Sequence, residues 1–330
     1  MPGKATRAAF GEALLELGAR DERIVTLDAD LSKSTMTVAF AKKHPDRAFN
    51  LGIAEQNMIG TGAGLALAGK IPFVCSFACF LVGRFETIRI SVAYTNANVK
   101  LVGTHAGIAI GEDGYSQMGL EDVACIRSLP NIAIVQPADE LETKQAVAYA
   151  VEHEGPVYLR LTRQTMEPVC PPDYRFRLGQ WLVLRGGRDV TLIGSGGPIG
   201  NCLEAARLLA AESISAEVVN AASIKPHRRG PRAGGRSGRR RRRIARRGHA
   251  HAVEAAGGAG LRRVRRFQGA LRQARPRSGR HRRQREEVPQ PLRPGRRAWL
   301  SRDHSDSLSR SPERRARRTA ATSAQWDTRI

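Results

Sequence analysis

Three short segments of the chain combine polar side chains, which could move protons, with the ends of predicted strands, where a site would lie. Residues 52–57 (Gly-Ile-Ala-Glu-Gln-Asn) place one acid, Glu55, at the start of a stretch rich in small residues. Residues 76–80 (Ser-Phe-Ala-Cys-Phe) carry two aromatic rings, and residues 103–105 (Gly-Thr-His) precede a Gly-Glu-Asp-Gly motif at 111–114. Carboxyl and imidazole groups do acid–base chemistry, and the two Phe residues come just after a predicted strand. These segments are therefore candidates for one site.

The elements that must position these residues alternate along the first half of the chain. Short β-branched runs predict strands, and apolar residues at helical spacing predict helices. The predicted strands are 23–28, 72–75, 99–103, 132–136 and 157–161, and the predicted helices are 10–17, 54–69, 83–94, 120–128 and 139–152. Such alternation indicates a doubly wound parallel α/β sheet, in which ligands bind at the carboxyl ends of the strands.

A second, shorter α/β pattern follows a Pro-rich linker at 166–178. Its predicted strands are 181–184, 190–193 and 216–219, with a helix at 203–211, and the pattern stops at Pro226. We therefore expect a domain at 1–165, and an incomplete α/β C-terminal domain at 179–226.

Residues 227–330 have a different composition from the rest of the chain. The formal net charge of the whole chain is +23, yet this last segment contains 32 Arg, 7 Asp and Glu, and no Lys. A shifted reading frame in GC-rich DNA would produce that bias, so this segment is a candidate frameshift product. With so few apolar residues we expect it to be disordered and to bind nucleic acid, at most, non-specifically.

Cysteine spacing and targeting signals indicate an ordinary reducing compartment. The five Cys form no C-x-x-C pair and no metal-ligand spacing, so we expect no metal ligands in this chain. The N-terminus has no apolar signal segment, and no apolar run is long enough to span a bilayer. We expect a cytoplasmic protein.

The motifs together resemble the C-terminal half of transketolase. The resemblance covers roughly residues 1–226 and keeps the family's order; it is carried by 5–7 (Ala-Thr-Arg), 28–32 (Asp-Ala-Asp-Leu-Ser), 52–58, Phe77, Phe80, 104–105, 111–114 and 161–164 (Leu-Thr-Arg-Gln). It implies a thiamine-diphosphate pyrimidine-binding domain followed by the start of the transketolase C-terminal domain. Because some transketolases are split into two chains, the start at Met1 resembles such a C-terminal section.

The resemblance assigns cofactor roles to three residues. Glu55 matches the acid that hydrogen-bonds N1′ of the thiamine aminopyrimidine and so activates the cofactor for attack on a ketose. Phe77 and Phe80 match aromatic residues that pack on the pyrimidine ring. The simpler alternatives are a helix-start acid that complements the helix dipole and two ordinary core side chains.

The resemblance also assigns substrate roles. His105 matches a catalytic His that contacts the reacting substrate, and Asp113 matches an acid that binds a sugar hydroxyl. Arg7, Ser34 and Arg163 match positions that bind the sugar phosphate, where Arg offers a bidentate fork. The alternatives are a hydrogen-bonded structural His, solvated surface charges and a helix cap.

Two departures from the family pattern concern specificity and the metal. Gln117 stands where many transketolases have a second His, which removes a charge from the acceptor site. The chain also lacks the Gly-Asp-Gly motif followed by Asn with which the family holds Mg²⁺ and the diphosphate. We therefore expect Mg²⁺ ligands from a transketolase N-terminal section, in a hetero-oligomer built on a dimer.

The resemblance implies transfer of a two-carbon ketol unit from a ketose phosphate to an aldose phosphate. A 1-deoxy-D-xylulose-5-phosphate synthase-like enzyme would use the same Glu and cofactor. A different class of function is also open, an inactive truncated chain whose basic tail binds polyanions.

Overall fold

The computed structural model describes residues 3–226, so the expectations for residues 227–330 lie outside the described part. The helices are α1 (Thr6–Gly18), α2 (Ser32–Thr35), α3 (Val38–Lys43), α4 (Glu55–Leu67), α5 (Ala78–Val82), α6 (Phe85–Thr87), α7 (Asp122–Ser128), α8 (Glu140–Glu152) and α9 (Pro198–Ala211), with 3-10 turns η1 (Pro45–Arg47) and η3 (Tyr115–Gln117) and the π-helix η2 (Ile88–Tyr94). The strands are β1 (Lys4–Ala5), β2 (Ile24–Asp28), β3 (Ala48–Asn50), β4 (Ile71–Phe77), β5 (Lys100–Thr104), β6 (Ala133–Val135), β7 (Val157–Arg160), β8 (Thr165–Met166), β9 (Leu182–Arg185), β10 (Val190–Gly194), β11 (Ala216–Asn220) and β12 (Ser223–Lys225).

A seven-stranded sheet in the order β12-β6-β7-β5-β4-β2-β3 forms the centre of the first domain. All neighbouring strands from β6 to β3 run parallel, and β12 alone pairs antiparallel. Strands β2, β4, β5 and β7 are buried along their whole length, as expected of a sheet covered on both faces. The predicted α/β fold class with a parallel sheet is confirmed.

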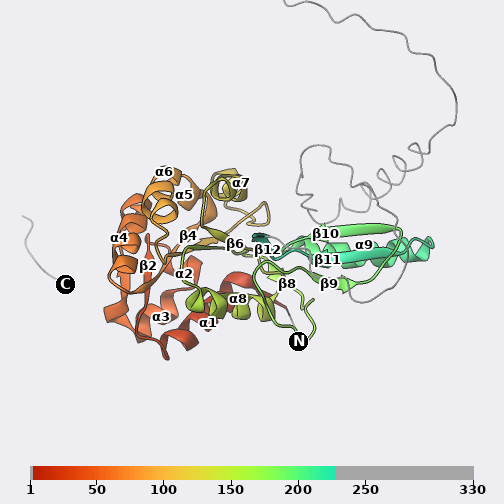
Figure 1. Cartoon of the computed structure of the whole chain (residues 1–330), viewed down its shortest axis with the longest axis horizontal. Coiled ribbons are helices and arrows are strands. Elements are labelled where there is room, and N and C mark those ends of the chain that lie inside the picture. The colour runs from red at the N-terminus through yellow and green to blue at the C-terminus, as the bar shows by residue number, and fades with distance from the viewer. Residues whose placement is uncertain (1–2, 227–330) are drawn as a thin grey trace, which may run out of the picture. The chain divides into compact units, whose positions relative to one another are not determined.

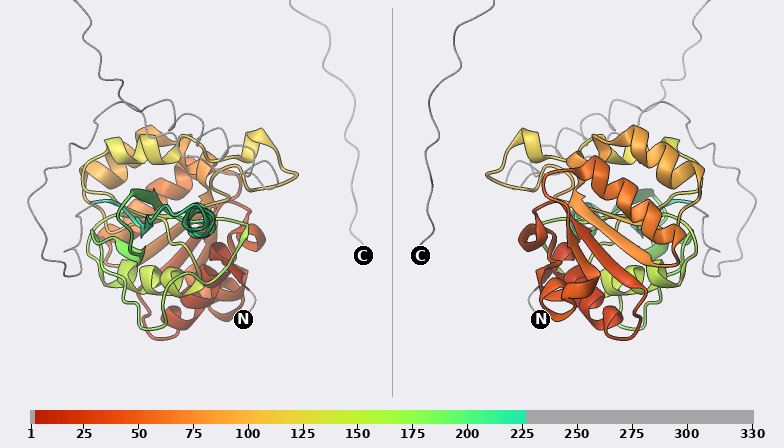
Figure 2. Two further views of the ribbon diagram at one scale, coloured as in Figure 1. Left: turned by 90° about the vertical axis from the view of Figure 1, so that its right-hand side faces the viewer. Right: turned by 90° about the vertical axis from the view of Figure 1, so that its left-hand side faces the viewer.

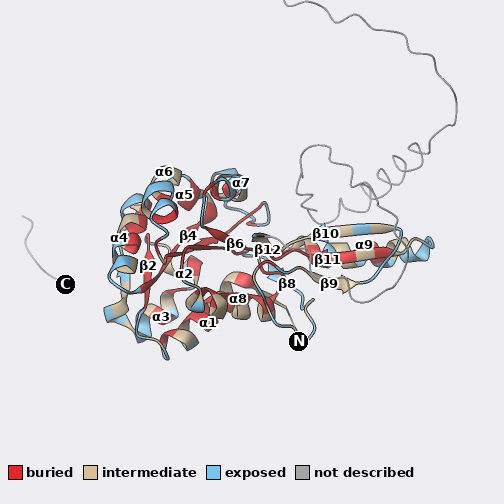
Figure 3. Cartoon of the chain, viewed as in Figure 1, coloured by how far each residue is buried: buried red, intermediate tan, exposed pale blue. Residues whose placement is uncertain are grey.

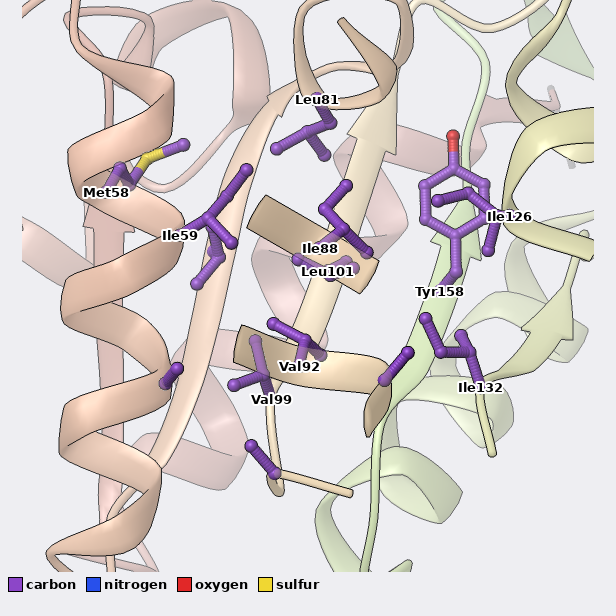
Figure 4. Close-up of a cluster of buried hydrophobic side chains, with 14 of the residues drawn as sticks. Met58, Ile59, Leu81, Ile88, Val92, Val99, Leu101, Ile126, Ile132 and Tyr158 are labelled. Carbon is purple, nitrogen blue, oxygen red and sulfur yellow. The ribbon is translucent and has the colours of Figure 1, made fainter. Parts of the chain in front are cut away.

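Helices cover both faces of this sheet (Figures 1 and 2). One face packs on α4, α5, η2 and α7 through an apolar cluster that includes Met58, Leu81, Val92 and Ile126 (Figure 4). The other face packs on α1, α3 and α8 through a second cluster. Figure 3 shows buried residues concentrated along the strands and the inner sides of these helices. The two clusters fix the strand ends on which the site is built.

The observed elements differ from the predicted ones where local signals are weak. The predicted helix at 83–94 is the short α6 followed by the π-helix η2. Helix α9 begins at Pro198, earlier than predicted, because Pro fits the first helical turn, where its missing N–H leaves no bond unmade. Strands β3 and β12 each span three residues and were not predicted.

The second pattern forms its own sheet, in the order β10-β11-β9, with α9 packed against it. The last strand of this part of the chain, β12, does not join that sheet. It pairs antiparallel with β6 of the first sheet. Glu142 at the start of α8 also links the two parts, since its carboxylate accepts hydrogen bonds from Tyr174 Oη (2.7 Å) and Asn220 Nδ2 (2.9 Å). The domain boundaries at 165 and 179 remain a prediction.

Candidate active site

A hollow of about 340 Å³ lies at the carboxyl ends of the parallel strands. It is lined by Arg7, Lys33, Ser34, Phe77, His105, Asp113, Gln117 and Arg163. These residues come from α1, from α2 after β2, and from the segments that follow β4, β5 and β7. The sheet therefore brings together residues that are far apart in the sequence, at the edge where parallel sheets bind ligands.

His105 lines this hollow, and each of its two ring nitrogens makes a hydrogen bond. Its Nδ1 is 2.9 Å from Thr104 Oγ1, whose hydroxyl donates to the Ser76 carbonyl (3.4 Å). The Thr104 oxygen must therefore accept from Nδ1–H. Arg7 Nη1 donates to Nε2 of His105 (3.2 Å), so Nε2 carries the lone pair. The hydrogen bonds thus select a neutral imidazole with its proton on Nδ1.

Burial and neighbouring charge keep this imidazole neutral. Desolvation, followed by the positive charges of Arg7 and Arg163, lowers the pKa of His105 to about 4. The ring also stacks on Phe77 with centroids 3.8 Å apart, and its backbone has a φ of 55°. A positive φ is uncommon outside Gly and is often found at functional positions.

Arg7 ties the start of the chain to the site. The neighbouring Thr6 Oγ1 accepts a hydrogen bond from the Thr162 N–H (2.8 Å), and Arg7 Nη1 donates to the Ser34 carbonyl (2.9 Å). Burial, followed by the nearby charge of Arg163, lowers the pKa of Arg7, which at neutral pH still leaves the guanidinium charged.

Arg163 and Asp113 form the exposed rim. Arg163 Nη1 lies 3.1 Å from Asp113 Oδ2 and donates to the Ile110 carbonyl (2.9 Å). Both side chains are about two-fifths exposed, so solvent weakens their attraction. Arg163 remains able to turn its other donors toward a ligand.

The loop that carries Asp113 and Gln117 is anchored at its end by a buried ion pair between Arg160 and Asp122, which was not predicted from the sequence. Arg160 Nε and Nη2 donate to both oxygens of Asp122 (2.8 and 3.2 Å), and Arg160 Nη2 also donates to the Gly119 carbonyl (2.9 Å). Tyr158 Oη completes the cluster with a bond of 2.7 Å to Asp122. This cluster holds the end of the loop against β7.

Glu55 lies in a separate, larger hollow of about 810 Å³, lined by residues 54–57, Gly60 and residues 83–87 except Phe85. Glu55 is only 4% exposed, yet among residues 3–226 no donor reaches its carboxylate. Helix α5 runs between the two hollows, because Phe77 at its start lines the first and Gly83 at its end lines the second. Phe80 lies within α5, parallel to Phe77 at 5.4 Å.

The structure therefore divides the predicted site residues into two groups. Arg7, Ser34, Phe77, His105, Asp113 and Arg163 share the smaller hollow, whereas Glu55 lines the larger one. Phe80, which was also predicted to bind the cofactor, lines neither hollow. Lys33 was missed, although its position beside Ser34 in a motif ending a strand was a usable signal. Asp28 was also not assigned a role, and it holds α2 in place by accepting bonds from the Leu31 N–H and the Thr35 and Thr37 hydroxyls.

Residues 3–226 contain neither a metal-binding cluster nor a membrane-spanning helix. Within this range no group of three or more His, Cys, Asp or Glu is arranged to hold a metal ion. No helix in the same range has the length and apolar character needed to cross a membrane.

Comparison with known proteins identifies the family. Residues 3–168 match the family model of the transketolase pyrimidine-binding domain, and residues 179–230 match that of the transketolase C-terminal domain. A Methanocaldococcus jannaschii protein described as a transketolase C-terminal section is 46% identical over 226 residues, which is 68% of this chain and 72% of that protein. The 6-deoxy-6-sulfo-D-fructose transketolase subunit of a Clostridium species is 40% identical over 67% of this chain and 69% of its own length.

A solved structure supports the same conclusion. A split-gene transketolase described as an inactive β4 tetramer has 51% sequence identity and a TM-score of 0.63, covering 68% of this chain and 72% of that one. With both family models matched in order, the chain belongs to the transketolase family and corresponds to its C-terminal section.

Proposed function

We propose that this chain is the pyrimidine-binding half of a thiamine-diphosphate-dependent transketolase. With an N-terminal-section partner it transfers a two-carbon ketol unit from a ketose phosphate to an aldose phosphate. The observation that carries the proposal is the hollow in which the cations Arg7 and Arg163 and the acid Asp113 surround a neutral His105.

The larger hollow fits the aminopyrimidine of the cofactor. The carboxylate of Glu55 accepts no hydrogen bond from residues 3–226 and lines the hollow, so a ring nitrogen that carries a proton could donate to it there. Phe77 stacks on both His105 and Phe80, so the aromatic pair stands next to the smaller hollow, and Phe80 itself lines neither hollow. When bound, thiamine diphosphate supplies the electron sink for the two-carbon fragment.

The smaller hollow fits a sugar phosphate. Arg7, Arg163 and Ser34 would hold the phosphate, and Asp113 would accept a hydrogen bond from a sugar hydroxyl. The lone pair on His105 Nε2 can accept a proton from a substrate hydroxyl once Arg7 turns from the imidazole to the phosphate. Gln117 offers an amide in place of a charge, so it would hydrogen-bond the acceptor without attracting it.

A partner chain would supply the Mg²⁺ ligands and the diphosphate site. We propose that it covers the α4 face, which we define as Ile53, Gly60, Gly64, Leu67, Ile90 and Tyr94. The four large side chains of this set are exposed, and a Cβ built on either glycine would meet no atom within 4 Å. The helices α4 and η2 that carry this face pack together beside the Glu55 hollow, and exposed apolar patches mark interaction sites. The relative described as an inactive β4 tetramer supports the idea that this chain alone is inactive.

The test is two-carbon transfer by the full chain mixed with a transketolase N-terminal section, thiamine diphosphate and Mg²⁺. Glu55→Gln should lower turnover by about 10²-fold or more, because an acid–base group is lost with little change in shape. Glu16→Gln, on the exposed side of α1, is the matched control and should leave turnover unchanged. Near-normal turnover of the Glu55 variant would exclude the role given to this acid.

A further inference from the structure

The smaller hollow contains a cation to which residues 3–226 offer no partner. Lys33 belongs to α2, lines the hollow together with Arg7 and Arg163, and is exposed. Within residues 3–226 its ammonium group makes no hydrogen bond and no ion pair. An ammonium group without a partner at the wall of a ligand-sized hollow is free to bind an anion there.

The backbone that carries Lys33 is fixed from two sides. The buried Asp28 carboxylate accepts bonds from the Leu31 N–H (2.7 Å) and the Thr35 hydroxyl (2.7 Å), which flank α2 and end it. Arg7 Nη1 binds the carbonyl of Ser34, the residue next to Lys33. The lysine side chain therefore starts from a position set by the core, and only its flexible stem needs to adjust to a ligand.

The side chains that line the hollow carry two more positive than negative charges at neutral pH. Arg163 is paired with Asp113, and His105 is uncharged at neutral pH. Arg7 is bonded to a carbonyl and an imidazole, neither of which carries negative charge. Of the residues that line the hollow, Arg7 and Lys33 are thus the two positively charged ones that have no acidic partner in the described part of the chain.

We propose that Lys33 makes this site selective for a substrate whose terminal group carries two negative charges over one whose terminal group carries a single charge. The inference rests on the proposed function and names the substrate class for it. A phosphate monoester has about 1.5–2 negative charges at neutral pH, which match Arg7 and Lys33. A sulfonate has one negative charge, so Arg7 and Lys33 attract it less strongly than they attract the phosphate.

The named relative that uses a sulfonated sugar makes this distinction specific. The subunit for 6-deoxy-6-sulfo-D-fructose shares 40% identity with this chain, so the same fold serves a singly charged terminal group in that protein. In this chain the second uncompensated cation favours the doubly charged group.

The experiment compares two small anions that differ only in the terminal group. The full chain is titrated with glycerol 3-phosphate and with 2,3-dihydroxypropane-1-sulfonate, and dissociation constants are measured by calorimetry or NMR. The wild type should bind the phosphate more tightly. Lys33→Gln should weaken phosphate binding about tenfold, as expected for one charge-assisted bond, and sulfonate binding by less than about threefold.

Two further variants separate charge in the hollow from charge elsewhere. Lys33→Arg keeps the charge and should keep the preference for phosphate. Lys42→Gln removes the same charge from the exposed end of α3, outside the hollow, and should change neither constant. The inference is overturned if the wild type binds both anions equally, or if Lys33→Gln keeps the wild-type preference.

Failure of the inference can be distinguished from failure of the proposed function. If the preference depends on Lys33 but the chain and its partner transfer no two-carbon unit, the anion selectivity stands and the transketolase reaction does not. If transfer occurs with an unchanged phosphate preference in Lys33→Gln, the reaction stands and the role of Lys33 does not.

Discussion

The Arg7 guanidinium donates a hydrogen bond of 3.2 Å to Nε2 of His105, although the two residues are 98 positions apart in the chain. With Thr104 at the other ring nitrogen, this contact fixes which nitrogen carries the proton. It also places a positive charge beside the imidazole, so protonation would bring two cations together. His105 is therefore an acceptor at Nε2 throughout the neutral pH range.

NMR titration of His105 tests this assignment. The pKa of His105 is lowered from 6.5 to about 4, so its ring should not titrate between about pH 5.5 and 8, and its nitrogen shifts should show a neutral ring protonated at Nδ1. Arg7→Met should raise this pKa, because it removes one of the neighbouring charges. Arg20→Met, at an exposed position after α1, should not change it. A wild-type ring that titrates near 6.5 would contradict the assignment.

The lowered pKa of His105 makes the free energy of unfolding depend on pH. Between about pH 6.5 and 4 the unfolded chain binds more protons at this His than the folded chain. The free energy of unfolding that depends on a neutral His105 is thus fully present above pH 6.5, and it is lost as the pH falls toward 4. Arg7→Met should reduce this loss in acid, as measured by denaturant unfolding at each pH.

The buried pair of Asp122 and Arg160 should dominate the stability of the substrate loop. Asp122→Asn leaves the Arg160 charge, which is 9% exposed, without its counter-charge, and should lower the free energy of unfolding by about 3–5 kcal/mol. Denaturant unfolding measures this. The exposed pair of Glu204 and Arg207 is the control, and Glu204→Gln should have little measurable effect because solvent screens it.

Gly103 is required by the approach of Tyr158. A Cβ at position 103 would lie 2.3 Å from Tyr158 Oη, and that hydroxyl is held by Asp122. Gly103→Ala should therefore cost about 1–3 kcal/mol in unfolding free energy through overpacking. Gly64→Ala is the matched control, because its Cβ would meet open space, and the better helix propensity of Ala should stabilise α4 by up to about 1 kcal/mol. Equal effects of both changes would contradict this explanation.

The α4 face should bind the partner chain. Leu67→Arg places a charge on this face without disturbing the core, because Leu67 is 77% exposed. We expect the variant to fold normally and to lose stable association with the N-terminal section, as judged by size-exclusion chromatography of the mixture. Val183→Arg, at an exposed apolar position on β9, is the control and should leave association intact. Unchanged association of the Leu67 variant would move the interface elsewhere.

Local patterns in the sequence predict the series of buried strands and most of the helices between them. Strands β2, β4, β5 and β7 each overlap their predicted range, because continuous β-branched runs are a local signal that the whole strand carries. Helix α8 was predicted to begin at Asp139 and begins at Glu140. Asp139 is its N-cap residue, because the Asp139 side chain accepts a hydrogen bond from the Glu142 N–H. The family motifs also contain several residues that line the hollows, among them Glu55, Phe77 and His105, whereas Lys33 and residues 83–87 lie outside those motifs.

Features that depend on partners distant in the chain could not be predicted from local patterns and follow from the fold. Strands β3 and β12 have three residues each, too few to show a period, and exist through pairing with β2 and β6. The neutral state of His105 comes from burial and from Arg7, and the free charge of Lys33 comes from the absence of an acid near it within residues 3–226. These properties depend on distances between side chains across the sheet, which folding sets and which local sequence patterns do not encode.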